Sequence, residues 1–138
     1  MRIPAKGRYA VAALIELAMQ PNDRPMTIAQ LAEKQNISLS YLEQLFAELR
    51  KQGLIRGARG PGGGYRLARP AEEISIIDIL KAIDERVVET PAEDEAYVPF
   101  VLWGRVSQQL QQFLADISLA DCVEQKDALF APRASETA

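Results

Sequence analysis

The chain has 138 residues, of which 48% are hydrophobic and 25% charged, and its formal net charge is −3. This composition is typical of a globular protein with one modest core, and no apolar run approaches the roughly 18 residues that a membrane-spanning helix requires. Because there is no histidine and a single cysteine, Cys122, the composition excludes histidine-dependent catalysis, histidine-ligated metals and an intramolecular disulfide, and it indicates a cytoplasmic protein.

The charge is unevenly divided along the chain. Residues 1–70 contain eleven Lys and Arg against five Asp and Glu, which is a net +6, whereas residues 71–138 carry a net −9. Electrostatic attraction to a polyanion acts through the local basic surface rather than through the total charge. The basic half therefore favours nucleic-acid binding, and the alternative is an arbitrary imbalance between two surfaces.

Three helices are predicted in the basic half. The first covers residues 5–19 and ends before Pro21. A capping box of Thr27 and Gln30 opens a second helix of about eight residues, which ends near Asn36. The third begins at Ser38 or Ser40 and ends at Gly53. Its predicted buried stripe consists of Leu39, Leu42, Leu45, Phe46 and Leu49.

The second and third helices, joined by a tight turn, form the pattern of a helix-turn-helix, and the alternative is an αα-hairpin whose polar face meets only water. Two short strands follow, 54–56 and 65–67, around the segment Arg59-Gly60-Pro61-Gly62-Gly63-Gly64-Tyr65. Four glycines and a proline exclude a helix there and favour a hairpin tip. Three helices followed by a hairpin are the element order of a winged helix-turn-helix domain, which favours DNA binding.

A nucleotide-binding loop is the other interpretation of these glycines. A phosphate loop requires Lys followed by Ser or Thr after its last glycine, whereas Tyr65-Arg66 stands there. A dinucleotide fingerprint requires a following helix, whereas Pro70 closes a predicted strand. Both nucleotide interpretations are therefore rejected.

The acidic half is predicted to contain a short helix over 75–84, an acidic linker over 85–97 and a helix of about twenty residues from Val98. A narrow apolar stripe on that long helix predicts a homodimer interface at Leu102, Val106, Leu110, Phe113 and Ile117. A short last helix starts at Ser118, and a disordered tail covers 126–138. The predicted division is a DNA-binding domain over 1–84, the linker, a dimerisation unit over 98–125 and the tail.

Three segments, 6–11, 37–46 and 59–65, resemble the iron–sulfur cluster regulator IscR and its relatives. The resemblance covers roughly residues 1–123. It implies a mainly α protein, in which a winged helix-turn-helix domain carries a long C-terminal dimerisation helix. It also implies a homodimeric repressor or dual regulator that binds a palindromic DNA operator and controls iron–sulfur assembly and iron-linked genes.

The resemblance also implies the DNA contacts. Major-groove contacts fall on Ser38, Ser40, Tyr41, Glu43 and Gln44, and the wing contacts fall on Arg59, Gly60, Pro61, Gly62 and Gly63. The chemistry agrees, because glutamine can pair with adenine, glutamate can accept from cytosine N4, and arginine fits a narrow minor groove. Hydroxyl groups are suited to phosphates.

The sensor is where the chain departs from the family. Family members hold an iron–sulfur cluster with three cysteines and a nearby histidine, and the corresponding segment here, 84–100, contains neither residue. Three alternatives are open: a regulator without a cluster that responds to a protein partner, a redox switch at Cys122, or Cys122 as a ligand of an iron–sulfur cluster completed by other groups. A winged-helix interaction adaptor is the rival from another class, and no constellation of residues indicates an enzyme.

Overall fold

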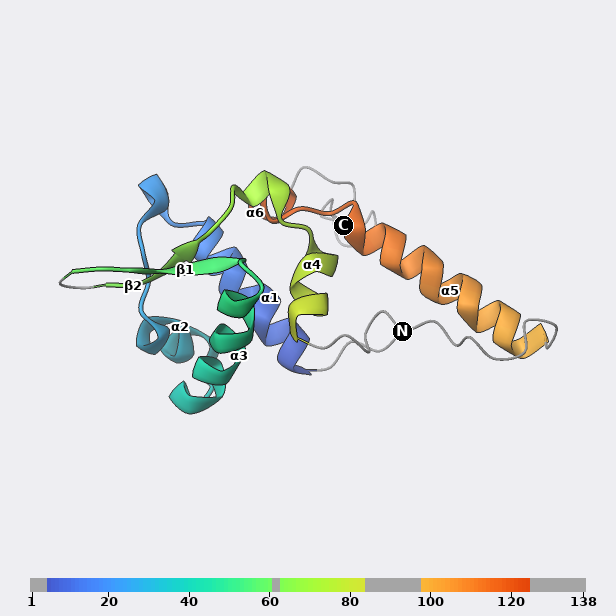
Figure 1. The fold of residues 1–138 in the computed structure, drawn as a ribbon, viewed down its shortest axis with the longest axis horizontal. Coiled ribbons are helices and arrows are strands. Elements are labelled where there is room, and N and C mark those ends of the chain that lie inside the picture. Colours follow the sequence, from blue (N-terminus) through green and yellow to red (C-terminus); the bar gives the residue numbers. More distant parts are fainter. Residues whose placement is uncertain (1–4, 61–62, 84–97, 125–138) are drawn as a thin grey trace, which may run out of the picture.

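A computed structural model describes residues 5–60, 63–83 and 98–124. The elements in order are α1 (Ala5–Ala18), η1 (Pro21–Asp23), α2 (Ile28–Gln35), α3 (Leu39–Lys51), β1 (Ile55–Ala58), β2 (Gly64–Leu67), η2 (Ala71–Glu73), α4 (Ile76–Ile83), α5 (Val98–Ala115) and α6 (Leu119–Glu124). Helices α1 to α4 pack together, the β1–β2 hairpin projects from one side of them, and α5 extends away on the other (Figure 1). The predicted mainly α winged-helix fold is confirmed, whereas the predicted linker 85–97 and tail 126–138 lie outside the described residues.

Local capping bonds set the ends of the short helices. The Thr27 hydroxyl accepts from Gln30 N at 3.1 Å, and the Gln30 side chain accepts from Thr27 N at 2.9 Å, so the predicted capping box is present. Asn36 ends α2 with a φ of 54°. Ser38, rather than Ser40, caps α3, because the Ser38 hydroxyl accepts from Tyr41 N at 3.2 Å.

The core lies between α1, α3 and α4. Its largest fully buried side chains are Leu14, Leu31, Leu42, Phe46, Leu49, Leu54, Ile55, Ile74, Ile79, Leu80 and Leu119. The predicted stripe of α3 is buried with one exception: Leu39 is 47% exposed. That part of the prediction is wrong, because Leu39 is the first residue of α3, and the fully buried side chains of the helix begin at Leu42.

The wing is an antiparallel pair of strands with the register Ile55↔Leu67 through Ala58↔Gly64. The connection between α1 and α2 forms an isolated β-bridge to this two-stranded sheet: Met26 N donates to Tyr65 O at 3.0 Å, and Tyr65 N donates to Met26 O at 2.7 Å. The hairpin is therefore tied to the helices by main-chain bonds and is not an isolated ribbon, which would be only marginally stable in water.

The chain returns to the core after α5. Ile76 N donates to Ile117 O and Leu119 N donates to Ile74 O, both at 2.9 Å, and α6 packs against α1. Ile117 is only 4% exposed, so its predicted place in a dimer stripe is wrong. The helix ends at Ala115, and the apolar residue that follows it is drawn into the domain. Within residues 98–124, α5 protrudes, whereas Ile117 and α6 pack against the core.

Candidate nucleic-acid interface

Helix α3 presents the predicted major-groove residues on its outer face. Its inward side chains are buried against the core, which fixes the rotation of the helix. Ser38, Ser40, Glu43 and Gln44 are exposed, and Tyr41 is half-buried. The structure therefore gathers all five predicted residues on the N-terminal two turns of one helix, which is the part that reads base edges in helix-turn-helix proteins.

The first turn of α3 combines two features suited to a phosphate. Because the Ser38 oxygen accepts from Tyr41 N, its O–H remains a donor that can turn outward. The Tyr41 ring packs edge-on against Tyr9, with centroids 5.9 Å apart and an interplanar angle of 87°. That contact with α1 fixes the tyrosine ring and so limits where its hydroxyl can reach.

The wing tip needs glycine for steric reasons at two positions. A Cβ at Gly63 would lie 2.6 Å from the Ala58 carbonyl oxygen, closer than packed atoms approach. Gly64 has a φ of 133°, and a Cβ there would collide with the Met26 carbonyl oxygen. The tip is therefore thin, with Arg59 and Gly60 exposed on it. Two predicted contacts, Pro61 and Gly62, lie outside the described residues.

Two side-chain contacts orient the wing relative to α3 and the α1–α2 connection. The rings of Phe46 on α3 and Tyr65 on β2 meet edge-to-face, with centroids 5.1 Å apart. Arg66 Nη1 lies 3.7 Å from Asp23 Oδ2 in η1. Sequence reasoning missed Asp23 and Met26 as wing anchors, since they lie about forty residues before their partners and no local pattern marks them.

A groove of about 630 Å³ lies beside α3, the predicted recognition helix, at the point where the wing packs against it. It is lined by Ile28, Glu43, Ala47, Arg50, Lys51 and Tyr65. Arg50 and Lys51 are both exposed and add two positive charges between the predicted helix contacts and the wing. They were not among the predicted contacts, although two adjacent basic residues in the last turn of a recognition helix were a visible signal.

Cys122 lies on α6, outside the elements that form this surface. It is half-buried on α6 against the core, and burial together with the neighbouring Asp121 carboxylate raises the pKa of its thiol. A raised pKa disfavours the thiolate that iron–sulfur clusters require. Within the described residues no three His, Cys, Asp or Glu side chains group as metal ligands. The donor set therefore does not fit the family's cluster.

Helix α5 carries an exposed apolar face. Leu102, Val106 and Phe113 of the predicted dimer stripe are 53%, 45% and 47% exposed, and Leu110 is half-buried. Trp103 and Val98 extend the same face. Exposed apolar surface of this extent on one helix is typical of an interaction surface. None of the described helices is long and apolar enough to cross a membrane.

A helix-turn-helix with an exposed polar recognition face, a glycine-rich wing and a protruding apolar helix defines a winged-helix DNA-binding regulator. Residues 3–125 match the family Rrf2, described as iron-dependent transcriptional regulators, and the chain belongs to this family. The predicted IscR-like resemblance is thereby confirmed, and the family and its named members are transcription regulators, not enzymes.

Two relatives illustrate the similarity in sequence. The HTH-type transcriptional regulator IscR of Erwinia tasmaniensis is 41% identical over 136 residues, which cover 94% of this chain and 82% of that protein. The regulator of the same name from Serratia proteamaculans is also 41% identical over 136 residues, covering 94% of this chain and 83% of the relative.

Solved structures show the same similarity in the fold. CymR, the global cysteine regulator of B. subtilis, superposes with a TM-score of 0.82 at 32% identity, over 92% of this chain and 99% of that one. The IscR of T. potens gives a TM-score of 0.78 at 31% identity, over 100% of this chain and 97% of the other. The fold is thus shared with two solved regulators that are 31–32% identical to this chain.

Proposed function

We propose that the protein is a homodimeric repressor of iron-linked genes that binds a palindromic operator in the cytoplasm. The observation that carries the DNA-binding mode is the joint surface of α3 and the wing. The Phe46–Tyr65 ring contact joins α3 to the wing, and the Met26–Tyr65 bridge ties the wing to the α1–α2 connection. Arg50 and Lys51 line the groove beside them. A recognition helix in the major groove and a wing along the backbone or minor groove suit this shape.

In this binding mode the residues divide by task. Gln44 and Glu43 reach base edges, because amide and carboxylate groups discriminate adenine and cytosine. Ser38, Ser40 and Tyr41 contact phosphates. Arg59 enters the minor groove, and Gly60, Pro61, Gly62 and Gly63 make the other wing contacts to the minor groove and the backbone.

Iron-linked target genes are supported by the family description and by the IscR relatives. The signal that controls this regulator is not supported in the same way by the likeness to IscR. The chain has one cysteine and no histidine, and Cys122 is packed against the core. We therefore assign the regulator a signal other than a resident iron–sulfur cluster, such as a protein partner.

A titration of operator DNA at several salt concentrations tests the binding mode. Duplex binding should weaken steeply with salt, because phosphate contacts release counterions. Arg59→Ala should cost about 1–3 kcal/mol of binding free energy, since it removes a groove contact. Lys81→Ala, which removes an exposed charge on α4 away from the groove, is the matched control and should bind almost as the wild type does.

Equal affinities for Arg59→Ala and wild type would contradict the wing assignment. Salt-insensitive binding to a protein, without DNA affinity, would favour the interaction adaptor instead.

A further inference from the structure

Two arginines stand opposite each other across the wing, and the proposed binding mode gives neither of them a task. The strand register pairs Arg56 of β1 with Arg66 of β2. Residues that are directly opposite in an antiparallel pair have Cβ atoms only about 4.5–5.5 Å apart, and like charges in such a pair destabilise the hairpin. The pair therefore does not stabilise the fold, which points to a role in binding.

Both arginines lie on the outer face of the wing. Successive side chains of a strand point to opposite faces. Tyr65, which precedes Arg66, packs its ring against Phe46 of α3, and Ile55, which precedes Arg56, is buried in the core. Arg56 and Arg66 therefore lie on the face opposite to the one that packs against α3.

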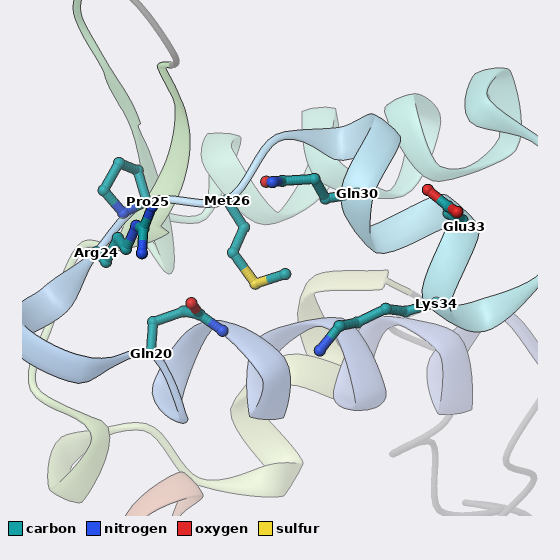
Figure 2. A pocket seen from close by; sticks show the side chains of 7 residues that line it. All are labelled: Gln20, Arg24, Pro25, Met26, Gln30, Glu33 and Lys34. Carbon is teal, nitrogen blue, oxygen red and sulfur yellow. The ribbon is translucent and has the colours of Figure 1, made fainter.

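Arg66 is held by the connection between α1 and α2. Its Nη1 lies 3.7 Å from Asp23 Oδ2, and its side chain is 31% exposed. Figure 2 shows this connection passing beside the wing strands at Arg24 and Pro25, and the β-bridge of Met26 ties it to β2. Arg66 is thus a positioned charge with an acidic partner of its own.

Arg56 is the free member of the pair. It is exposed, and it forms no ion pair within residues 5–60, 63–83 and 98–124. Ala58 and Gly64, the next pair along the same face, have a methyl group and no side chain, so they leave the approach to this face open. Because the Arg66 charge repels it, the Arg56 guanidinium is directed outward. A guanidinium is a planar fork of donors that matches a phosphate group.

We propose that Arg56, with Arg66 behind it, is a further phosphate-binding site of the wing, separate from Arg59 at the tip. A wing that enters a minor groove has one sugar–phosphate strand on each side, because two strands border that groove. The outer face of the wing meets the strand farther from α3. Arg56 binds a backbone phosphate of that strand and fixes the orientation of the wing without reading the sequence. This assignment rests on the proposed DNA-binding function.

Titration of Arg56→Gln with duplex DNA tests the site, using a duplex that wild type selects from a random-sequence library. The variant should bind about fivefold more weakly, and by a similar factor on a scrambled duplex, because phosphates carry no sequence information. Between about 50 and 200 mM salt, it should lose about 3.5-fold less affinity than wild type, since about one counterion fewer is released. Lys81→Gln, which makes the same charge change at an exposed site on α4, should behave as wild type does.

The stability of the fold should change in the opposite direction. Arg56→Gln removes one of two opposed like charges, so it should unfold at the same or a higher urea concentration than wild type. Arg56→Glu, which places a carboxylate opposite Arg66, should unfold at a higher concentration still and bind DNA more weakly than Arg56→Gln. If both variants lost stability together with DNA affinity, Arg56 would have a structural role and the proposal would be overturned.

Duplexes in which one backbone phosphate at a time is replaced by an uncharged methylphosphonate locate the contact. At one position, or at one in each half of a palindrome, the replacement should weaken wild type about fivefold and leave Arg56→Gln unchanged. That position should lie on the minor-groove strand farther from the major-groove site of α3. A loss spread evenly over many positions would reduce Arg56 to diffuse attraction, and a position on the nearer strand would overturn the assignment to the outer face.

The titrations also separate this site from the proposed function. If wild type bound no duplex, the proposed function and the site would both be wrong. If wild type bound DNA, and Arg56→Gln had the same affinity and the same salt dependence, only the site would be wrong.

Discussion

At the scale of single residues, the wing depends on positions where a side chain cannot fit. Gly64 combines a φ of 133° with close contact to the Met26 main chain. Gly57 on β1 is a glycine of the same hairpin without these constraints, because a Cβ there meets nothing within 4 Å. Alanine substitutions at Gly64 and at Gly57 can therefore be compared, and the comparison separates the steric requirement at Gly64 from the general effect of replacing a glycine in this hairpin.

We expect Gly64→Ala to destabilise the fold by about 1–3 kcal/mol, because it forces a methyl group against the Met26 carbonyl at a left-handed backbone position. Gly57→Ala should change stability by less than about 0.5 kcal/mol. Urea unfolding followed by circular dichroism measures both. A Gly64→Ala protein as stable as wild type would contradict the described attachment of the wing.

Cys122 is the second residue whose role depends on its surroundings. Burial and the Asp121 carboxylate raise the pKa of its thiol, so the thiol stays protonated at neutral pH. We expect its alkylation rate in the native protein to rise with pH through a midpoint above that of the unfolded chain, since only the thiolate reacts. Iodoacetamide labelling followed by mass spectrometry measures both rates.

The same argument predicts that Cys122→Ala keeps its operator affinity, whether the protein is prepared with or without oxygen. If wild type purified anaerobically contained iron and sulfide that the variant lacked, the exclusion of a cluster would be wrong.

At the scale of elements, the start of α3 has both a structural and a binding task. Ser38 caps the helix through Tyr41 N, and its remaining O–H is assigned to a phosphate. We expect Ser38→Asp to keep the cap and the stability of the fold, because aspartate is a good N-cap, while its charge repels the phosphate and weakens DNA binding.

Ser38→Ala is the matched variant, and it should lose about 1 kcal/mol of stability with the cap. Thermal unfolding and operator titration of the two variants separate the tasks. Ser38→Asp binding as tightly as wild type would remove Ser38 from the interface.

At the scale of the whole molecule, α5 is the helix that carries an exposed apolar face. Val106, Leu102 and Phe113 are close to half exposed on one face, and Gln108 lies on the opposite side of the helix. A second copy packing on this face would complete a dimer and bring two recognition helices to a palindrome.

We expect Val106→Glu to be monomeric in light scattering, because it places a charge in the interface, and Gln108→Glu to remain a dimer. The monomer should bind a full operator about a hundredfold more weakly, because the two half-sites are no longer bound together. A dimeric Val106→Glu protein would move the interface elsewhere.

Interactions of short range could be predicted from the sequence. The capping box of Thr27 and Gln30 consists of bonds between residues three apart, so the spacing alone marks it, whereas the spacing left both Ser38 and Ser40 open as the cap of α3. The order of three helices and a glycine-rich hairpin likewise follows from local periodicity and turn chemistry. These signals sufficed for the fold class and for the exposed polar face of α3.

Features that depend on residues far apart in the chain were decided by the tertiary structure. An apolar repeat does not tell which of its members face the protein's own core. The repeat on the long helix therefore predicts Ile117 in a dimer interface, whereas the structure buries Ile117 in the domain. The Met26–Tyr65 bridge, the Asp23–Arg66 contact and the groove beside α3 join segments that are far apart in the chain. The sequence by itself determined the order of the helices and the hairpin and their approximate ends, because these are set by neighbours along the chain. Only packing decided how the wing is held and which surfaces remain open, because those are set by neighbours in space.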